Sequence, residues 1–214
     1  MANELIDIYD DNMRPIGTMM RNEAEASGNW HKSIHCWVVR PADGGYVLFQ
    51  KRGRDKKLFP NTLDITAAGH YKAGETKENG VREILEELGI DIPFNSLLPL
   101  GVKHDVAAIG NVVNREFCDV YLLKRDEHPA DYRLDPSEVE GLVEIKIDEG
   151  LRLFSGENKF ARATGVEWNK RMETWNTVEM DVTTESTIPR VDAYYLKIFI
   201  MAKLMLKGER YLSI

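Results

Sequence analysis

The sequence predicts an α+β fold in which helices cover a mixed central β-sheet, with a helical extension at the C-terminus. Three observations lead to this fold class. β-rich segments bounded by turn residues recur up to residue 147, an acidic helix interrupts them, and a long apolar helix closes the chain. With 214 residues, 43% of them hydrophobic, the chain suits one domain with appendages. We expect a domain over residues 1–150 that includes an N-terminal hairpin, and an insert and helix over residues 151–214 that pack on the same domain.

The predicted strands come first in the chain. Leu5–Tyr9 alternates apolar and polar residues, and Pro15–Met19 returns after a turn-like segment, which indicates a hairpin. Ser33–Arg40 and Tyr46–Arg52 flank the turn sequence PADGG and form a second strand pair. Further apolar segments predict strands at Leu63–Gly69, Leu97–His104, Arg115–Leu123 and Gly141–Ile147.

Two helices are predicted between and after these strands. Thr76 can cap a helix that runs to Leu88 and ends at Gly89, a residue type that favours helix C-termini. Ala163–Ile188 is polar and poorly periodic, so no regular element is predicted there. Val191–Lys207 is a terminal helix with a wide apolar face.

Composition limits the classes of function. The formal net charge is −7, the opposite of what a binder of nucleic-acid polymers needs, although a small phosphorylated ligand and a bound cation remain compatible with it. Cys36 and Cys118 lie in apolar runs, which favours buried free thiols in a reducing compartment. Met1–Asp10 does not resemble a signal peptide, and Tyr194–Leu206 is too short to span a membrane. We expect a cytoplasmic protein without a membrane partner.

The chemistry is predicted to lie on the acidic helix. Glu83, Glu86 and Glu87 stand at helical spacing i, i+3 and i+4, so their carboxylates share one face. Their mutual repulsion costs a few tenths of a kcal/mol per pair, and a hard divalent cation would turn it into binding. Carboxylates suit Mg²⁺, with Mn²⁺ as the alternative. Alone, such a cluster more often marks a solvated helix face, so the surrounding sequence must show whether these acids bind a metal.

The segment from Gly69 to Ile90 resembles the Nudix box, G-x5-E-x7-R-E-U-x-E-E-x-G-U, where U is a bulky aliphatic residue. The residues that match in type are Gly69, Glu75, Arg82, Glu83, Ile84, Glu86, Glu87, Gly89 and Ile90. The resemblance implies a Nudix-type α/β/α sandwich and Mg²⁺-dependent hydrolysis of a diphosphate linkage. The substrate would be a nucleoside diphosphate derivative or a small organic diphosphate. It also implies that the helix acids bind metal together with the Gly69 carbonyl, while Arg82 orients them.

The box departs from the family pattern at one place. Six residues, Thr76–Val81, separate Glu75 from Arg82, where the pattern has seven. Gly80 also occupies a helical position, at a cost of about 1 kcal/mol relative to alanine. We expect a helix that starts late or a shortened loop, which puts the contact between Glu75 and Arg82 in question.

The surrounding chain resembles the isopentenyl-diphosphate isomerase branch of the superfamily. The resemblance rests on DIYD…PIGT, NWHKSIHCW and LFQKRGRDKKLFPNTLDITAAGH. His31, His70 and Glu116 match ligands of the isomerase metal site, so Glu116 joins the implied metal ligands. Ala68, however, replaces the isomerase cysteine, and Asn114 replaces a carboxylate. A hydrolase on an isomerase-like frame is therefore preferred.

The same resemblance implies basic residues that bind the diphosphate, which we call the phosphate grip. Arg52 and Lys56 align with residues that hold the isomerase substrate, and Arg21 sits at a third such position. Arginine is shaped for bidentate phosphate contacts, and lysine supplies a point charge. An ordinary exposed basic loop explains these residues equally well.

A base must activate the attacking water. Glu138 lies in a loop before a predicted strand, where family members place such an acid, and we take it as the catalytic candidate. Glu140 in the same loop, Glu116 and the helix glutamates are the other candidates.

Two further functions stay open. One is isomerase-like activity on isopentenyl diphosphate, and the other is a non-catalytic sensor that binds a nucleotide or a diphosphate. In all three cases the partner is a small molecule, with selectivity from residues outside the box, here within Glu149–Arg190. A homodimer through the N-terminal hairpin or the C-terminal helix is a further hypothesis.

Overall fold

Among the residues that the structure describes, no helix is long and apolar enough to cross a membrane. The two cysteines, Cys36 and Cys118, are buried and free, as predicted. The structure is a computed structural model, and it describes residues 4–54, 56, 59–109 and 112–214.

Strand β3 (Trp30–Arg40) is the centre of the sheet. It is rich in β-branched and aromatic residues and is buried along most of its length, as expected of a strand covered on both faces. It pairs antiparallel with β1 (Leu5–Tyr9), β4 (Tyr46–Arg52) and β6 (Ala67–His70), and parallel with β8 (Val112–Lys124). The sheet is therefore mixed, as predicted.

The remaining strands extend the sheet from this centre. The path β11-β10-β9-β4-β3-β1-β2 runs from one edge to the other, while β5 joins β4, β6 and β8 join β3, and β7 joins β8. The bounds of these other strands are β2 Pro15–Met20, β5 Leu63–Asp64, β7 Leu98–Ile109, β9 Val139–Lys146, β10 Ala161–Asn169 and β11 Thr174–Val182.

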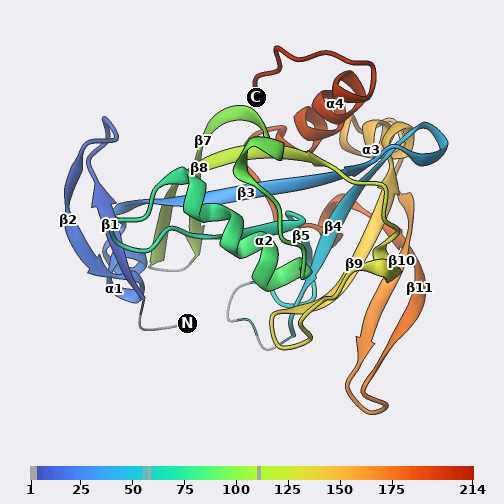
Figure 1. The fold of residues 1–214 in the computed structure, drawn as a ribbon, viewed down its shortest axis with the longest axis horizontal. Coiled ribbons are helices and arrows are strands. Elements are labelled where there is room, and N and C mark those ends of the chain that lie inside the picture. The colour runs from blue at the N-terminus through green and yellow to red at the C-terminus, as the bar shows by residue number, and fades with distance from the viewer. Residues whose placement is uncertain (1–3, 55, 57–58, 110–111) are drawn as a thin grey trace.

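Strands β3 and β4 diverge soon after the hairpin that joins them (Figure 1). Their register includes only two pairs, Val39 with Val47 and Arg40 with Tyr46. Beyond these pairs β3 takes β6 as its partner, and β4 takes β5 and β9. The sheet thus has two arms, and the segment of β5 and β6 connects them.

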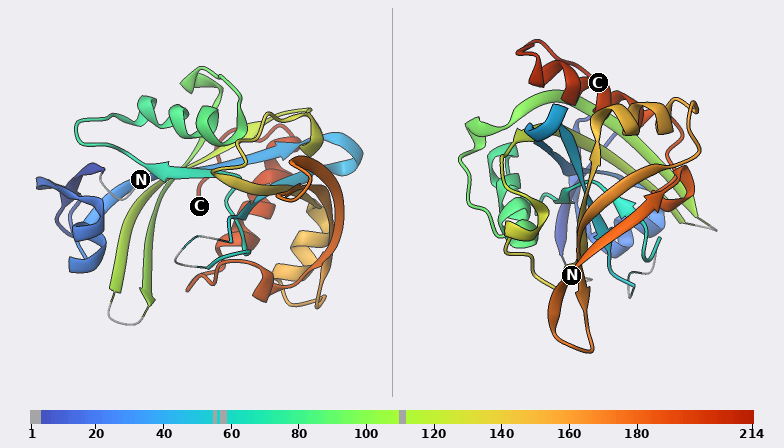
Figure 2. Two further views of the ribbon diagram at one scale, coloured as in Figure 1. Left: turned by 90° about the horizontal axis from the view of Figure 1, so that it is seen from below. Right: turned by 90° about the vertical axis from the view of Figure 1, so that its right-hand side faces the viewer.

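Helices cover both faces of the sheet (Figure 2). Helix α2 (Val81–Leu88) lies on one face, and α3 (Ile147–Phe154) and α4 (Tyr194–Leu206) lie on the other. A short helix, α1 (Arg21–Ser27), accompanies the N-terminal hairpin. This arrangement confirms the predicted sandwich and its C-terminal helix.

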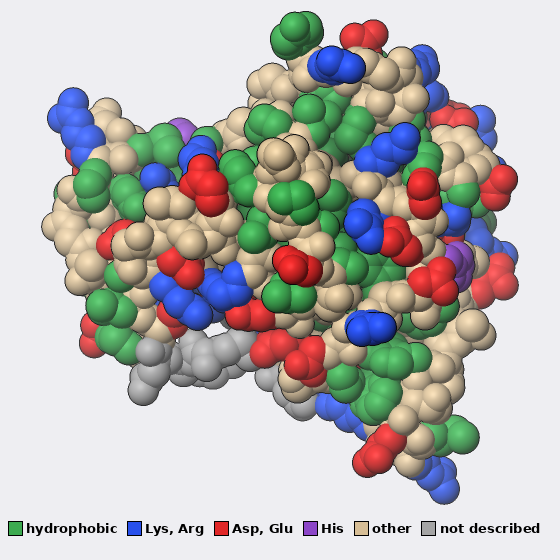
Figure 3. All heavy atoms as spheres, viewed as in Figure 1, with side chains coloured by type: hydrophobic (Ala, Val, Ile, Leu, Met, Phe, Trp, Pro, Cys, Tyr) green, Lys and Arg blue, Asp and Glu red, His purple; other side chains and the backbone are tan. Residues whose placement is uncertain are grey.

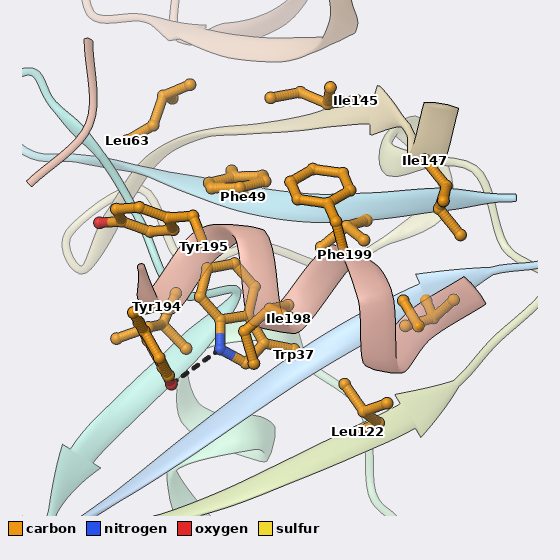
Figure 4. Close-up of a cluster of buried hydrophobic side chains, with 14 of the residues drawn as sticks. Trp37, Phe49, Leu63, Leu122, Ile145, Ile147, Tyr194, Tyr195, Ile198 and Phe199 are labelled. Carbon is orange, nitrogen blue, oxygen red and sulfur yellow. Dashed lines mark hydrogen bonds between the residues drawn. The ribbon is translucent and has the colours of Figure 1, made fainter. Parts of the chain in front are cut away.

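The larger core lies between the sheet and α4 (Figure 4). Trp37 and Phe49 from the sheet meet Tyr194, Tyr195 and Phe199 from the helix. The Trp37 indole Nε1 donates a hydrogen bond of 3.0 Å to the Tyr194 hydroxyl, which satisfies a buried polar group. Truncating one of these rings to alanine would remove about 3–5 kcal/mol of stability.

The second core anchors α2 to the opposite face. Ile34, Cys36 and Val38 alternate along β3 with the residues of the first core, and they pack with Ile84 and Leu88 of α2. Because side chains alternate between the faces of a strand, β3 serves both cores at once. The burial of Ile84 and Leu88 fixes which side of α2 is left for its acids.

Residues 161–182 differ from the expectation for that segment. They form the hairpin of β10 and β11, and β10 pairs with β9 to widen the sheet beyond residue 150. β11 is an edge strand, and most of its residues are at least partly exposed, so its sequence carries little apolar alternation. Across the hairpin Trp168 pairs with Trp175, with ring centroids 5.2 Å apart. The proposed domain division at residue 150 stays a prediction.

Candidate active site

A cavity of about 980 Å³ opens between the two arms of the sheet and α2. Acidic and basic side chains are interspersed on the face of the molecule that carries α2 (Figure 3). Ten of the predicted site residues line the cavity: Arg21, Arg52, Lys56, Gly69, Arg82, Glu83, Glu86, Glu87, Glu116 and Glu138.

The three acids of α2 differ in environment. The Glu87 carboxylate is buried, and its Oε2 accepts hydrogen bonds from the Ala68 backbone N–H at 3.0 Å and from Gln50 Nε2 at 2.9 Å. Burial raises the pKa of Glu87 to about 8, although these hydrogen bonds oppose the shift. Burial also raises the pKa of Glu83. Glu86 is half exposed and also lines the cavity.

Glu83 lies directly against the backbone of β6. A β-carbon built on Gly69 would stand 2.0 Å from Glu83 Cδ, so only glycine permits this contact. The glycine of the box is thus required for the close approach of β6 and α2. The same approach brings the Gly69 backbone to the carboxylate that is expected to share a metal with it.

Arg82 holds the acids of the box in place. Its guanidinium forms ion pairs with Glu83 Oε1 at 2.8 Å, Glu86 Oε2 at 3.0 Å and Glu75 Oε2 at 3.4 Å. It also donates to the His70 carbonyl at 3.4 Å. The contact between Glu75 and Arg82, which the shorter spacing had put in question, is therefore present.

A 3₁₀ turn accounts for the missing residue of the box. Lys77–Gly80 forms this turn, and α2 begins only at Val81, which agrees with the expected late start. A 3₁₀ turn rises about 2.0 Å per residue, so four residues climb roughly as far as five in an α-helix. Gly80 is needed for packing, since a β-carbon there would lie 2.9 Å from Ile34 and Tyr71 atoms.

A second group of potential ligands adjoins the cavity, which His70 and Glu116 line while His31 is buried beside them. Atoms of His31, His70 and Glu116 that could bind a metal all lie within 4.8 Å of one another. His70 Nε2 is 3.5 Å from Glu116 Oε1, and Asn114 Nδ2 donates to the same oxygen at 2.5 Å. Burial lowers the pKa of His31. Burial alone would raise the pKa of Glu116, but His70 holds it well below its usual range.

The described residues contain one more group of this kind, formed by His35, Glu116 and Cys118. The carboxylates of α2 are not gathered as tightly. Arg82 donates to the half-exposed Glu86, whereas Gln50 and the Ala68 N–H donate to the buried Glu87. A cation shared by these carboxylates would replace some of these hydrogen bonds.

The basic residues of the cavity are paired with acids. Arg52 Nη1 lies 2.9 Å from Asp64 Oδ2, and Arg21 Nε lies 2.8 Å from Glu25 Oε1. Lys56 Nζ lies 3.7 Å from a Glu138 oxygen. Their role in binding phosphate stays a prediction.

The two acids of the loop before β9 have different partners. Glu140 is buried and bound to Arg54, whose backbone N–H and Nε donate to it at 2.7 and 2.5 Å. Glu138 instead lines the cavity and stays partly exposed. Of the two, Glu138 is better placed to meet a water molecule in the cavity.

Three polar residues of the cavity were not predicted from the sequence. Asp64, Asp105 and Arg190 line it and are largely buried. Arg190 Nη2 lies 3.0 Å from Asp64 Oδ1, and its Nη1 is bonded to Asp105. Single acids inside the apolar strand segments 63–69 and 98–109 were the available signal, but their common partner is far away in sequence.

Comparisons with known proteins bear on this site. Residues 29–163 match the family model described as the NUDIX domain. A protein of Clostridium acetobutylicum, named an uncharacterized Nudix hydrolase, is 37% identical over 196 residues, which are 91% of this chain and 95% of that protein. Nudix hydrolase 3 of Arabidopsis thaliana is 30% identical over 165 residues, 74% of this chain and 21% of that protein.

A more distant relative and a solved structure complete the comparison. An isopentenyl-diphosphate Delta-isomerase of Mycolicibacterium vanbaalenii is 32% identical over 121 residues, 55% of this chain and 65% of the isomerase. The crystal structure of DR0079 from Deinococcus radiodurans has a TM-score of 0.55 at 22% identity and covers 72% of this chain and 90% of that one. The structural match shows the shared fold.

Proposed function

This chain belongs to the NUDIX family of hydrolases, and we propose that it cleaves a diphosphate linkage with a divalent cation held at α2. The substrate would be a nucleoside diphosphate derivative or a small organic diphosphate. The main support for this proposal is that Arg82 contacts Glu75, Glu83 and Glu86 together, despite the shortened box. The acids expected to hold the cation are therefore supported by the rest of the motif.

The available donors fit Mg²⁺. Glu83, Glu86, Glu87 and the Gly69 carbonyl offer only oxygen atoms, which hard cations prefer. Glu83 fills the space that a β-carbon of Gly69 would need, so the carboxylate and the backbone are already in contact. Glu87 is buried with a raised pKa, and a cation would favour its ionised form. Mn²⁺ accepts the same ligands.

The residues of the chain divide the remaining work. The bound cation would neutralise the diphosphate and help to ionise the attacking water. Arg82 orients Glu83 and Glu86, and Arg52 and Lys56 bind phosphate oxygens once the substrate displaces their present acid partners. Glu138 accepts the proton of the water from its position at the cavity wall.

Isomerase activity is the second candidate, because His31, His70 and Glu116 are close enough to share a cation. A relative named as an isomerase also covers more than half of the chain. Against it, Ala68 lies at the position where that reaction needs a thiol. Hydrolysis is favoured because the box acids are complete.

The test is the formation of phosphomonoester or phosphate products from a panel of diphosphates with and without Mg²⁺. The variants Glu86→Gln and Glu87→Gln should each lower kcat at least about 100-fold while their circular dichroism matches that of the wild type. Mg²⁺-dependent hydrolysis retained by both variants would contradict the assignment. An allylic product without phosphate release would instead identify the isomerase.

A further inference from the structure

The cavity is larger than a diphosphate and its cation require. Its volume of about 980 Å³ lies at the upper end for small-molecule sites. Besides the acids of α2 and the basic side chains, Asp64, Asp105 and Arg190 line the cavity, and we call these three residues the floor.

The floor is a chain of buried ion pairs. Arg190 bridges the carboxylates of Asp64 and Asp105, with Nη2 3.0 Å from Asp64 Oδ1. Lys103 Nζ forms a further ion pair with Asp105, 2.9 Å from its Oδ1. Arg52 contacts Asp64 from the side of the predicted phosphate grip. The floor is thus continuous with the part of the cavity where the diphosphate is expected.

The charges of the floor balance. Asp64 and Asp105 carry two negative charges, and Arg190 and Lys103 carry two positive ones; Arg52 on Asp64 and Asp192 on Lys103 add one charge of each sign. Each carboxylate oxygen has one cationic partner and can accept a second hydrogen bond. The floor therefore offers hydrogen-bonding capacity without a net charge.

This chemistry selects among organic groups. A hydrocarbon chain would remove water from the ion pairs without replacing its hydrogen bonds, which is unfavourable. A second anionic group would be repelled by the two carboxylates. An uncharged group with hydroxyls can bond to the carboxylates, while Ile65 and Ile188, which also line the cavity, can contact its apolar faces.

We propose that Asp64, Asp105 and Arg190 form the subsite for the organic group of the substrate, and that this group is uncharged and rich in hydroxyls, as a sugar or ribose is. The proposal rests on the diphosphate hydrolysis proposed above. Arg190 lies beyond residues 29–163, which match the family domain, so the subsite depends on a segment outside that match.

Three diphosphate monoesters test the subsite, because each carries only one organic group. They are uridine diphosphate, the same compound with a further phosphate on its 3′-hydroxyl, and dimethylallyl diphosphate. We expect kcat/KM with Mg²⁺ to be at least about 100-fold higher for uridine diphosphate than for dimethylallyl diphosphate, and about 10-fold higher than for the phosphorylated form. Equal or better use of dimethylallyl diphosphate overturns the proposal.

Two variants link the preference to the floor. Asp105→Asn leaves an excess of positive charge, so use of the 3′-phosphorylated compound should rise about 10-fold relative to uridine diphosphate. General damage to the structure would lower both. Arg190→Gln should lower the preference for uridine over dimethylallyl at least about 10-fold, mainly through KM. The matched control is Arg162→Gln, which removes an exposed arginine that also lies near two acids, Glu179 and Asp181. An unchanged ratio in a folded Asp105→Asn variant contradicts the assignment.

Binding separates this proposal from the proposed hydrolysis. Calorimetry with the Glu86→Gln variant and Mg²⁺ ranks the three compounds without turnover. Preference for uridine diphosphate in binding, with no hydrolysis by the wild type, would contradict the hydrolase function and support the subsite. Hydrolysis without any preference would support the function and contradict the subsite. If none of the three compounds binds, the subsite proposal is wrong.

Discussion

Glu83 lies so close to Gly69 that a β-carbon at position 69 would stand 2.0 Å from the carboxyl carbon of the glutamate. Gly69→Ala must therefore push Glu83 away from β6. We expect kcat to fall at least about 100-fold, with a smaller effect on thermal stability. The matched control is Gly53→Ala, where the nearest atom among the described residues would be 3.9 Å away, and it should fold normally. Full activity of Gly69→Ala would show that Glu83 need not touch β6.

Arg82 and Glu75 should differ in importance. Arg82→Met leaves the partly buried carboxylates of Glu83 and Glu86 without their common partner, so kcat should fall at least about 100-fold. Glu75→Gln removes only a long contact of 3.4 Å, and a loss of about 3- to 10-fold is expected. Steady-state kinetics of the two variants checks the order. A larger loss for Glu75→Gln would show that the loop before α2 matters more than the ion pairs of Arg82.

The stability of the metal-free protein should depend on pH through Glu87. Its pKa is raised to about 8 in the folded chain, so folding favours the protonated carboxyl. Stability should fall as the pH rises from about 4.5, the ordinary pKa, to about 8, above which the whole cost is present. Urea unfolding between pH 5.5 and 8.5 measures this decline.

Two controls follow for that pH dependence. Glu87→Gln should flatten it, because the variant has no carboxyl to ionise. Mg²⁺ should raise the melting temperature more at pH 8.5 than at pH 5.5, since the cation binds the ionised form. A pH dependence identical in wild type and variant would assign the decline to other groups.

The Tyr194 hydroxyl joins two buried side chains. It lies 2.9 Å from His35 Nδ1 and accepts a hydrogen bond from Trp37 Nε1 at 3.0 Å. Tyr194→Phe leaves both without that partner, and we expect a loss of about 1–3 kcal/mol in unfolding free energy. Tyr211→Phe, at a fully exposed tyrosine, is the matched control. Equal stability of the two variants would show that the buried hydroxyl contributes nothing.

The acids of α2 were predictable because their information is local. Helical spacing alone puts Glu83, Glu86 and Glu87 on one side, and the apolar residues between them fix which side faces the core. The strands up to β9 were predictable for a similar reason, since apolar alternation and turn residues mark them directly. The contact between Glu75 and Arg82 was harder, because it depends on a 3₁₀ turn that the spacing did not reveal.

Local sequence patterns could not predict the floor of the cavity. Arg190 is 126 residues from Asp64 and 85 from Asp105 in the chain, and no periodicity connects them. The hairpin of β10 and β11 was missed because β11 lies at the edge of the sheet with few buried residues to mark it. Both the ion pairs of Arg190 and the hairpin of β10 and β11 depend on contacts between distant parts of the chain, which local sequence propensity does not indicate.

The position of Arg190 has a consequence for how the enzyme is made. During synthesis the acids of α2 emerge first, and the arginine that completes the floor follows 103 residues after Glu87. At about 5–20 residues per second this delay lasts roughly 5–20 s. Until then Asp64 and Asp105 lack their shared partner, and α4 has not yet covered β3. The nascent chain therefore contains the acids of the Nudix box well before its cavity is complete.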